Sequence, residues 1–581
     1  MERSQEQIQQ QKGLAIIFCL FLLYMWKETV YDQYFEAQTA KPAAVQTAPV
    51  APKAETQSFE EPAAPVEGAT EVKPGAVTKP SSYPSDKQLE QAGVLSLNTE
   101  TFNAKLSLLG GRLTELYLTQ FKAEATKDSA PLNMIQHVEQ APLPLGVYSG
   151  GINDALVQYS LVDTSGVAQP LPATVSLLGQ DRREFVLKGN LSDGREVTKT
   201  VTFFGRGYFI DTKVSLSAAP ADGSRAAIEW TQVIAKDSPS ILDPYSISGF
   251  VWWDAQKAHR ESFSKLTADV NDIPTANWIA VSDKYFMAAL VPPEGSPAKT
   301  MKTGELYRAR VSGSEIAAET RLFVGPKSYR LLKEVGSELY RVIDFGMTGI
   351  IAAPLLSMLH ALYDIFGNYG LAIIMLTIIV KSLLYPLNAS AFKQMKAMQD
   401  LAPELKKMKE TITDKQQQQL EMMALYKKKG VNPLGGCLPI LLQMPIFIGL
   451  YSALLLAIEL RHAPFALWIQ DLSSNERLMI GGIGIPVMVI LFVASMLVQQ
   501  MTTPSNMDPA QKRVMYIMPL VFGFMFASMP AGLTLYWLTN NVISIGQQMA
   551  MRRDSGKKAL AITGGISIAV FVLGFLLTRL G

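Results

Sequence analysis

The residue with the clearest chemistry in this chain is Lys381, the one full charge inside the apolar segment 370–388, GLAIIMLTIIVKSLLYPLN. A helix of about 19 residues is long enough to cross the hydrocarbon core of a bilayer. Thr377 and Tyr385 lie four residues to either side, so a helix places all three side chains on one face. A charge inside a span costs on the order of 3 kcal/mol, and it usually marks a water-filled cavity or a substrate path.

A second explanation of Lys381 is that its side chain snorkels. Asn388 lies about 10 Å farther along a helix, so the lysine stem reaches the nearer membrane interface. Polar side chains in the other apolar segments favour a hydrated groove, because a groove accounts for them and for the lysine together. Hydrogen bonding between helices is the simpler account of the polar groups alone. The polar side chains in question are Gln443, Ser452, Gln499, Gln500 and a stripe at helical spacing, Thr534, Trp537, Asn541, Ser544 and Gln548.

The composition is that of a protein with a large aqueous domain and a membrane part. The 581 residues are 48% hydrophobic, and the mean hydropathy is +0.14. The net charge of +2, from 53 basic and 51 acidic residues, gives no sign of a nucleic-acid partner. Cys19 and Cys437 both lie in apolar stretches, so the sequence offers no disulfide framework.

The first 86 residues are predicted to be an anchor and a tether. Residues 1–28 hold a short apolar helix that ends in the interfacial aromatics Tyr24 and Trp26. A cleaved signal peptide is the alternative, but acids precede the apolar core and no A-x-A site follows closely, so we favour an uncleaved transmembrane anchor. The acidic balance after it places the N-terminus in the cytoplasm. Residues 29–86, rich in proline and alanine, form an extended linker.

Residues 87–335 are predicted to form a domain of antiparallel strands. The clearest hairpin covers 195–217, where Tyr208, Ile210, Thr212, Val214 and Leu216 alternate with polar residues after a turn at 205–207. Several similar runs, separated by Gly, Asp and Pro, indicate a large antiparallel sandwich. Four tryptophans could line a carbohydrate or peptide groove, but packing in the core is the better-supported role. They are Trp230, Trp252, Trp253 and Trp278.

Residues 336–550 are predicted to be a helical membrane core. It begins with an amphipathic helix at 354–366, which is too short to span and lies in the interface. The predicted spans are near 368–388, 434–460, 478–498, 514–528 and 532–549. Residues 551–581 form a basic tail followed by a further apolar segment of span length, 559–579.

Residues 389–430 are predicted to form a helical hairpin on the cytoplasmic side. They contain nine lysines and no arginine, against five acidic residues. Methionines recur at helical spacing, and flexible thioethers suit a surface that accepts varied apolar partners. A solvated basic loop explains the lysines equally well, but it does not explain the methionines. We assign contacts with such partners to Met395, Met398, Met408, Met422 and Met423.

The charges of the loops give the orientation. Residues 459–478 carry two basic and three acidic residues, whereas the tail after the last core span is basic. With the lysine-rich hairpin in the cytoplasm, every loop follows the positive-inside rule. The β domain is then predicted to face away from the cytoplasm.

Motifs for enzymatic chemistry are absent from the sequence. It contains no G-x-x-x-x-G-K-[ST], no H-E-x-x-H, no nucleophile elbow and no cluster of cysteine and histidine. We therefore expect a protein that is not an enzyme and that uses no cofactor, metal or nucleotide.

Four long motifs resemble the YidC membrane protein insertases of Gram-negative bacteria. They are ALYKKKGVNPLGGCLPILLQMPIF (424–447), HAPFALWIQDLS (462–473), QKRVMYIMPLVF (511–522) and PAGLTLYWLTNNVISIGQQ (530–548). The resemblance implies a multi-span α-helical protein with an N-terminal anchor helix, a periplasmic antiparallel β-super-sandwich and a five-helix core that carries a basic groove. It also implies a multi-pass protein of the bacterial inner membrane, whose partners are nascent membrane proteins, the Sec translocon, the lipid bilayer and, where a basic tail is free, the ribosome.

Such a groove would hydrate the polar tail of a client, the membrane protein that is being inserted, part of the way across the membrane. The tail cannot cross hydrocarbon without losing its hydrogen bonds to water, at a cost of several kcal/mol for each unsatisfied group. We predict that Lys381, Thr377, Gln443, Trp537 and Asn541 line the groove and that Lys381 attracts acidic residues of the tail.

Two features depart from the family pattern. Family members usually carry arginine at the position of Lys381, and they usually end in a basic tail inside the cell. If the segment 559–579 spans the membrane, the C-terminus lies outside and a free ribosome-binding tail is lost. Two other classes of protein remain as alternatives at this stage. One is a transporter or channel that uses the same groove, although no internal repeat is visible. The other is a membrane-anchored periplasmic binding module.

Overall fold

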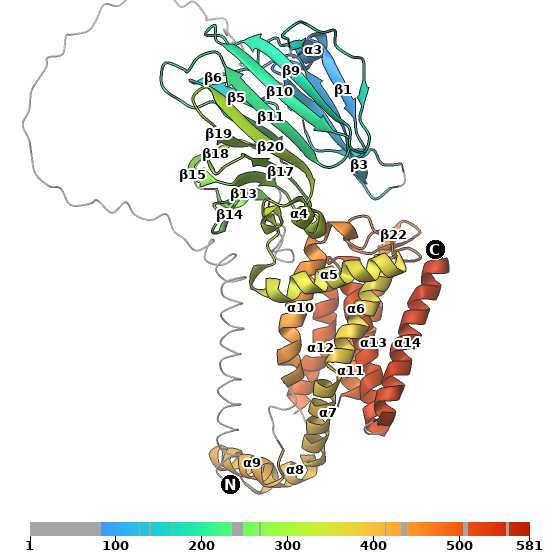
Figure 1. Cartoon of the computed structure of the whole chain (residues 1–581). Helices are drawn as coiled ribbons and strands as arrows, with labels where there is room; N and C mark the ends of the chain where they lie inside the picture. Colours follow the sequence, from blue (N-terminus) through green and yellow to red (C-terminus); the bar gives the residue numbers. More distant parts are fainter. Residues whose placement is uncertain are drawn as a thin grey trace, which may run out of the picture. The chain divides into compact units, whose positions relative to one another are not determined.

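The computed structural model describes residues 83–580, except 127, 137, 139–140, 164, 235–247, 267–268, 413, 432–437, 504–508 and 554–556. The predicted anchor 1–28 and nearly all of the linker 29–86 lie outside the described residues. Figure 1 shows the described chain as a strand-rich part followed by a helical part.

The described residues of the strand-rich part form three sheets, whose paired strands are antiparallel except for β1 and β8. The nine-stranded sheet has the order β14 (Ala258–Ser262), β13 (Gly249–Trp253), β16 (Trp278–Ser282), β17 (Phe286–Val291), β20 (Ala317–Pro326), β11 (Phe209–Leu216), β10 (Glu196–Phe204), β9 (Arg182–Asn190) and β7 (Ser160–Val162). The six-stranded sheet has the order β15 (Val270–Ala276), β18 (Ser296–Thr303), β19 (Leu306–Ser312), β12 (Ala227–Val233), β5 (Gly146–Ser149) and β6 (Ile152–Asn153). The five-stranded sheet has the order β4 (Pro131–Asn133), β3 (Arg112–Lys122), β2 (Phe102–Ser107), β1 (Val94–Asn98) and β8 (Val175–Ser176). Short helices α3 (Asp86–Gln91) and α4 (Tyr329–Val335) flank the strands.

The nine-stranded and six-stranded sheets pack face to face, as the alternating sequence pattern predicts for a sandwich. Strands β12 and β19 contact β16, β17 and β20 across the core. The predicted hairpin is confirmed, because β10 pairs with β11 from Phe203 opposite Ile210 to Val197 opposite Leu216. Trp230, Trp253 and Trp278 are buried and Trp252 is half-buried, so these rings pack in the domain core rather than line a groove.

A buried group of charges ties the three sheets together. Asp154 Oδ1 accepts from Arg112 Nη2 of β3 at 2.7 Å, and Oδ2 accepts from Lys199 Nζ of β10 at 2.7 Å. Tyr159 donates its hydroxyl to the same carboxylate at 3.0 Å, and all four side chains are at most 1% exposed. Burial alone would raise the pKa of Asp154, but the charges of Lys199 and Arg112 outweigh it and hold the pKa below its usual value.

The helical part contains ten α-helices among the described residues. They are α5 (Gly349–Phe366), α6 (Tyr369–Leu383), α7 (Tyr385–Asp400), α8 (Ala402–Thr411), α9 (Lys415–Lys428), α10 (Leu438–Leu456), α11 (Val487–Thr502), α12 (Pro509–Phe526), α13 (Ala531–Arg553) and α14 (Lys557–Leu580). By length and composition, Gly346–Phe366 and Lys558–Arg579 could each cross a membrane, and α6 with α7 would be a third span bent by 61°. Gln443–Leu456, Val487–Thr502 and Met515–Phe526 are shorter apolar helices.

The helix that carries Lys381 is shorter than predicted. Asn368 caps the N-terminus of α6 by accepting a hydrogen bond from Leu371 N. The helix ends at Leu383, because Pro386 has no N–H to donate to the carbonyl four residues earlier. Tyr385 therefore begins α7, and the prediction that it shares a helical face with Thr377 and Lys381 is wrong.

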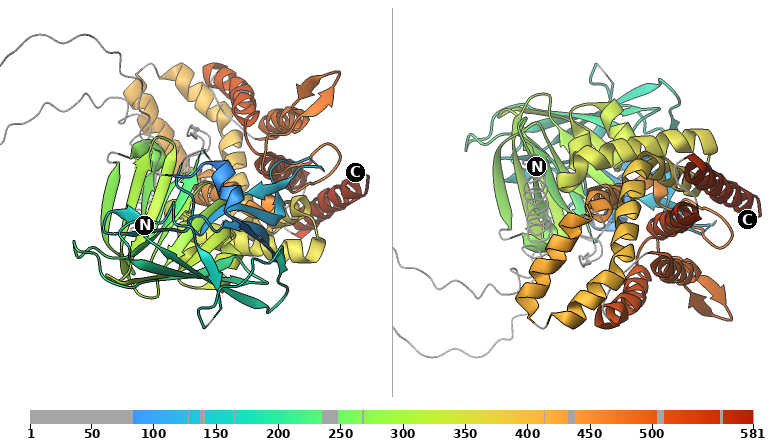
Figure 2. Two further views of the ribbon diagram at one scale, coloured as in Figure 1. Left: turned by 90° about the horizontal axis from the view of Figure 1, so that it is seen from above. Right: turned by 90° about the horizontal axis from the view of Figure 1, so that it is seen from below.

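The span predicted at 478–498 was given a start nine residues before the helix begins, at Val487. Residues Leu478–Ile480 and Ile483–Ile485 form the paired strands β21 and β22, and α11 starts only at Val487. Gly481 and Gly482 both have positive φ, as a two-residue hairpin turn between right-twisted strands requires. Figure 2 shows this hairpin projecting to the side of the helices.

The predicted interfacial helix is longer than expected. It starts at Gly349 instead of residue 354, and Pro354 lies inside it, where the missing N–H removes one backbone hydrogen bond without ending the helix. The argument that this helix is too short to span is therefore wrong. Its axis nevertheless crosses those of α6 and α10 steeply, as Figure 1 shows.

Candidate functional site

Lys381 lies inside the helical bundle. Its side chain is 5% exposed, and Nζ donates to Ser544 Oγ of α13 at 2.8 Å. Within the described part of the chain, no carboxylate lies within ion-pair distance of this ammonium group. The side chain thus points to a neighbouring helix and not along its own helix toward an interface, which argues against snorkelling. A buried cation without a carboxylate partner is a binding group for an anion.

A cavity of about 340 Å³ lies between α10, α11, α12 and α13. Three of the predicted groove residues, Gln443, Trp537 and Asn541, line it. Its other lining residues are Met444, Phe447, Met496, Gln499, Gln500, Thr503, Met515, Tyr536 and Asn540. The lining combines amides and two hydroxyls with flexible apolar side chains, so it suits a segment that has both polar and apolar residues.

Lys381 and Thr377 do not line this cavity. Thr377 is 1% exposed, and its hydroxyl donates to Ile373 O of the same helix at 2.7 Å. The link from Lys381 to the cavity runs through α13, where Ser544 Oγ donates to Asn540 O at 2.7 Å. The structure therefore brings four predicted residues into one connected region and leaves Thr377 as a packing residue.

Asn540 is the connecting residue that the sequence pattern missed. It accepts from Gln443 Nε2 of α10 at 3.0 Å, and its own amide approaches Asn541 Oδ1 at 3.5 Å. Asn541 Nδ2 in turn donates to Ser495 Oγ of α11 at 3.0 Å. The stripe that runs from Thr534 in steps of three, four, three and four residues takes position 541, although position 540 also lies at helical spacing from Trp537. The sequence signal that could have identified Asn540 is its position directly beside Asn541 in an apolar segment.

Two buried polar atoms in the cavity wall have no hydrogen-bond partner among the described residues. They are Trp537 Nε1, a donor, and Gln500 Oε1, an acceptor. The Trp537 ring is held by Phe447, with ring centroids 4.9 Å apart, and by Phe526 at 5.7 Å. Buried polar groups are almost always satisfied in proteins, so both atoms require water or a bound polar group in the cavity.

Three of the five methionines that were assigned to partner contacts pack inside the hairpin itself. Met398, Met408 and Met422 pack around a small core of Leu401, Leu405 and Tyr426. Met423 is 48% exposed and Met395 is half-buried, so these two present more surface to a partner. The assignment of client contacts to the five methionines stays a prediction.

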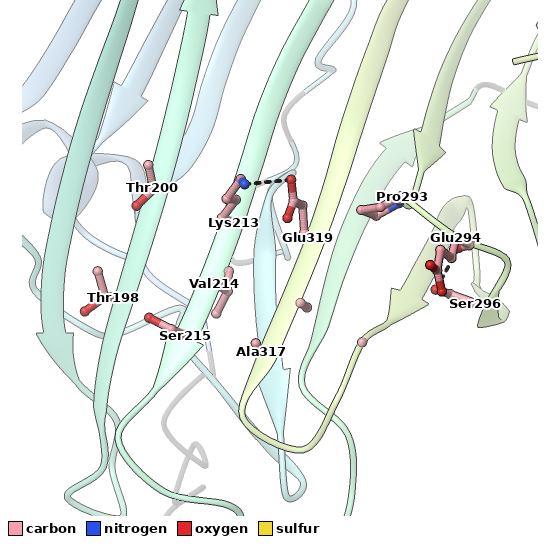
Figure 3. Close-up of a pocket in the computed structure, with 12 residues that line it drawn as sticks. Thr198, Thr200, Lys213, Val214, Ser215, Pro293, Glu294, Ser296, Ala317 and Glu319 are labelled. Atoms are coloured by element: carbon pink, nitrogen blue, oxygen red, sulfur yellow. Dashed lines mark hydrogen bonds and ion pairs between the residues drawn. The ribbon is translucent and has the colours of Figure 1, made fainter.

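The β domain carries a hollow of about 560 Å³, which Figure 3 shows beside β10, β11 and β20. Lys213 and Glu319 form an ion pair at 2.9 Å there, so the two charges neutralise each other. Both side chains are well exposed, and exposed ion pairs contribute little to the stability of a protein. The lining residues include no aromatic ring, so this hollow lacks the usual surface for stacking a sugar.

Two family models match the chain. The model described as "60Kd inner membrane protein" matches residues 361–558, and the one described as "YidC periplasmic domain" matches residues 94–358. The "Membrane protein insertase YidC" of Syntrophus aciditrophicus (strain SB) is 34% identical over 516 residues, which is 85% of this chain and 92% of that protein. The protein with the same description from Dechloromonas aromatica (strain RCB) is 34% identical over 577 residues, which is 94% and 98% of the two chains. A solved structure, "Active YidC insertase crystal structure with the first transmembrane domain resolved", matches with a TM-score of 0.35 at 19% identity, covering 77% of this chain and 90% of that one.

These matches define an inner membrane protein with a periplasmic domain, which the sandwich forms. The chain belongs to the YidC family of membrane protein insertases. Its substrates are accordingly nascent membrane proteins, and the transporter and binding-module alternatives are set aside.

Proposed function

We propose that this insertase moves the polar tail of a client through the region formed by Lys381, Ser544, Asn540 and the adjoining cavity. The observation that carries the proposal is the buried ammonium group of Lys381, which is hydrogen-bonded to a serine and has no carboxylate partner in the described chain. An acidic residue of the tail would supply that partner.

The physical task is to lower a barrier. Each unsatisfied polar group of a tail costs several kcal/mol in hydrocarbon, and the amides of Gln443, Asn540 and Asn541 offer replacements for lost hydrogen bonds. Burial of the client's apolar helix in the bilayer then supplies the free energy, at about 25 cal/mol for each Å² of apolar surface removed from water. No nucleotide is required by this scheme.

The arrangement in the membrane is also part of the proposal. We assign α6, α10, α11, α12 and α13 to the five-helix core, and α5 to the periplasmic interface. The N-terminus and the lysine-rich hairpin α7–α9 then lie in the cytoplasm, where the hairpin would receive clients. We propose that larger clients are handled together with the Sec translocon. A ribosome contact would depend on the basic residues 551–558 being accessible.

The experiment that tests this function is insertion by the purified full chain in liposomes that contain no other protein. The client is a small two-span protein with an acidic translocated loop, and inserted loops are scored by protection from protease. Protection well above that in protein-free liposomes is expected. Protection equal to the protein-free level would mean that the groove is not sufficient and that the translocon or a ribosome is needed.

The β domain is predicted to be largely dispensable for this reaction. Every side chain of the proposed path lies on α6 or on helices α10–α13, so replacing 87–335 by a short linker leaves the path intact. We expect the truncated chain to retain most of the insertion rate per reconstituted molecule. The same liposome assay, normalised to the amount of folded protein, measures it. A loss of more than about tenfold (1.4 kcal/mol) would assign the β domain a direct part in insertion.

A further inference from the structure

All but the first two residues of the last helix, α14, lie beyond the matched family region, which ends at residue 558. One face of α14 is built from small residues, and the structure buries them. Ala559, Thr563 and Ser567 are at most 8% exposed, and Gly574 is buried as well. The opposite face is apolar and open, with Ile568 66% exposed. Helices in membranes pack closely through such small residues and present their large apolar residues to lipid.

Helix α14 packs against α13 on one side. A Cβ placed on Gly546 of α13 would lie 2.6 Å from Ile566 Cδ1 and 3.5 Å from Ile566 Cβ. The glycine is therefore needed for this close approach. The contacting face of α13 is the reverse of its cavity face, since Gly546 and Trp537 are nine residues, or two and a half turns, apart.

Helix α14 also packs against α6, the helix that carries Lys381. A Cβ on Gly574 would lie 2.7 Å from Ile374 Cδ1 and 3.4 Å from Leu371 Cδ2 of α6. The Phe571 ring lies 5.0 Å from that of Phe366, the last residue of α5. Ile374 is two turns from Lys381 on the same face of α6. Because α6 and α14 run in opposite directions (Figure 1), the buried Ser567, two turns before Gly574, lies at the level of Lys381.

We propose that α14 is a fixed additional transmembrane helix that seals the seam between α6 and α13 against lipid behind Lys381. It stays in place during insertion, and clients do not pass through this side of the groove. The seal keeps acyl chains away from the helix face that bears the buried charge, whose exposure to lipid is unfavourable. The proposal rests on the insertion path described above for its functional readout, but the packing of α14 can be tested separately.

A disulfide between α13 and α14 tests whether the helix moves. The Cβ–Cβ distance of 3.5 Å between positions 546 and 566 lies within the range that a disulfide adopts. Gly546→Cys and Ile566→Cys are introduced together into full-length protein that carries Cys19→Ser and Cys437→Ser. After oxidation in proteoliposomes, both thiols should resist alkylation by a maleimide under denaturing conditions. Insertion should match that of the reduced sample within about twofold, or 0.4 kcal/mol.

Failure of the cysteines to cross-link would show that α14 is not docked on α13, and it would overturn the proposal whatever the insertion rate. Cross-linking with a reversible loss of insertion would overturn it as well, because α14 would then be a gate. A reduced sample that cross-links on oxidation but never inserts would contradict the insertion path and the seal's role in it, while leaving the docking of α14 established.

A wedge variant tests whether the seal matters. Gly574→Leu places a side chain against Ile374, whereas Gly564→Leu adds the same side chain where a new Cβ meets nothing within 4 Å. We expect Gly574→Leu to slow insertion at least threefold, and Gly564→Leu to leave it unchanged. Equal rates for the two variants would overturn the sealing role.

Discussion

Replacing Lys381 with alanine should lower the insertion of clients with acidic tails by about tenfold or more, and replacing it with arginine should preserve insertion. A hydrogen bond to a charged group contributes about 1.5–3 kcal/mol, and 1.4 kcal/mol corresponds to a factor of ten. Lys381 is a buried cation that is joined to the cavity network through Ser544 and Asn540. Arginine keeps the positive charge, although its planar fork differs from the compact ammonium group. The expected result is therefore a requirement for charge and not for guanidinium geometry.

The measurement is the liposome insertion assay with two clients that differ only in the acidic residues of the translocated loop. The Lys381→Ala defect should be large for the acidic loop and small for its amide counterpart, which isolates the interaction between the two charges. Lys393→Ala, which removes an exposed lysine of α7, is the matched control and should have little effect. Full activity of Lys381→Ala with several acidic clients would remove Lys381 from the proposed path.

Replacing Asp154 with asparagine should destabilise the β domain by about 3–5 kcal/mol, because it leaves the buried cations Arg112 and Lys199 without their counter-charge. Arg112 lies in the five-stranded sheet, Lys199 lies in the nine-stranded sheet, and Asp154 follows β6 of the six-stranded sheet. The loss of the carboxylate charge should therefore affect the whole domain. Urea midpoints measured by pulse proteolysis of the full chain give the change. Glu115→Gln, which breaks an exposed ion pair with Lys105, is the control and should cost at most about 1 kcal/mol.

The same carboxylate predicts a pH dependence. The pKa of Asp154 is lower in the folded domain than in the unfolded chain, so its contribution to stability is complete above the unfolded value of about 3.9 and disappears as the pH falls through the folded value. The stability difference between wild type and Asp154→Asn should therefore be constant from about pH 7 to pH 5 and shrink below pH 4. A difference that grows on acidification would contradict the assignment of the charged form.

The sequence by itself determined the features that depend on local pattern. Period-two alternation predicted the β10–β11 hairpin, because a strand with one buried face must alternate. Apolar length located a helix at each of the five predicted core spans, since a span must avoid polar residues over most of its length. Long motifs identified the family, which the comparisons confirmed. The isolated charge at Lys381 predicted a polar interior without any knowledge of what surrounds it.

Sequence pattern placed some element boundaries wrongly for a local reason. The stretch before α11 is apolar enough for a span, but two consecutive glycines with positive φ turn it into the β21–β22 hairpin. Pro386 ended α6 early and moved Tyr385 to another helix. Hydropathy averages over such residues and does not register the backbone conformation that they impose.

The partners of each side chain were decided by the tertiary structure alone. Lys381 donates to Ser544, Gln443 donates to Asn540, and Asp154 accepts from Arg112 and Lys199. These contacts join residues 42 to 163 positions apart in the sequence. Thr377, with the same spacing logic as Asn541, instead bonds to its own helix. A helical or strand period fixes which face a residue occupies, but the neighbour of that face is set by how the elements pack against one another.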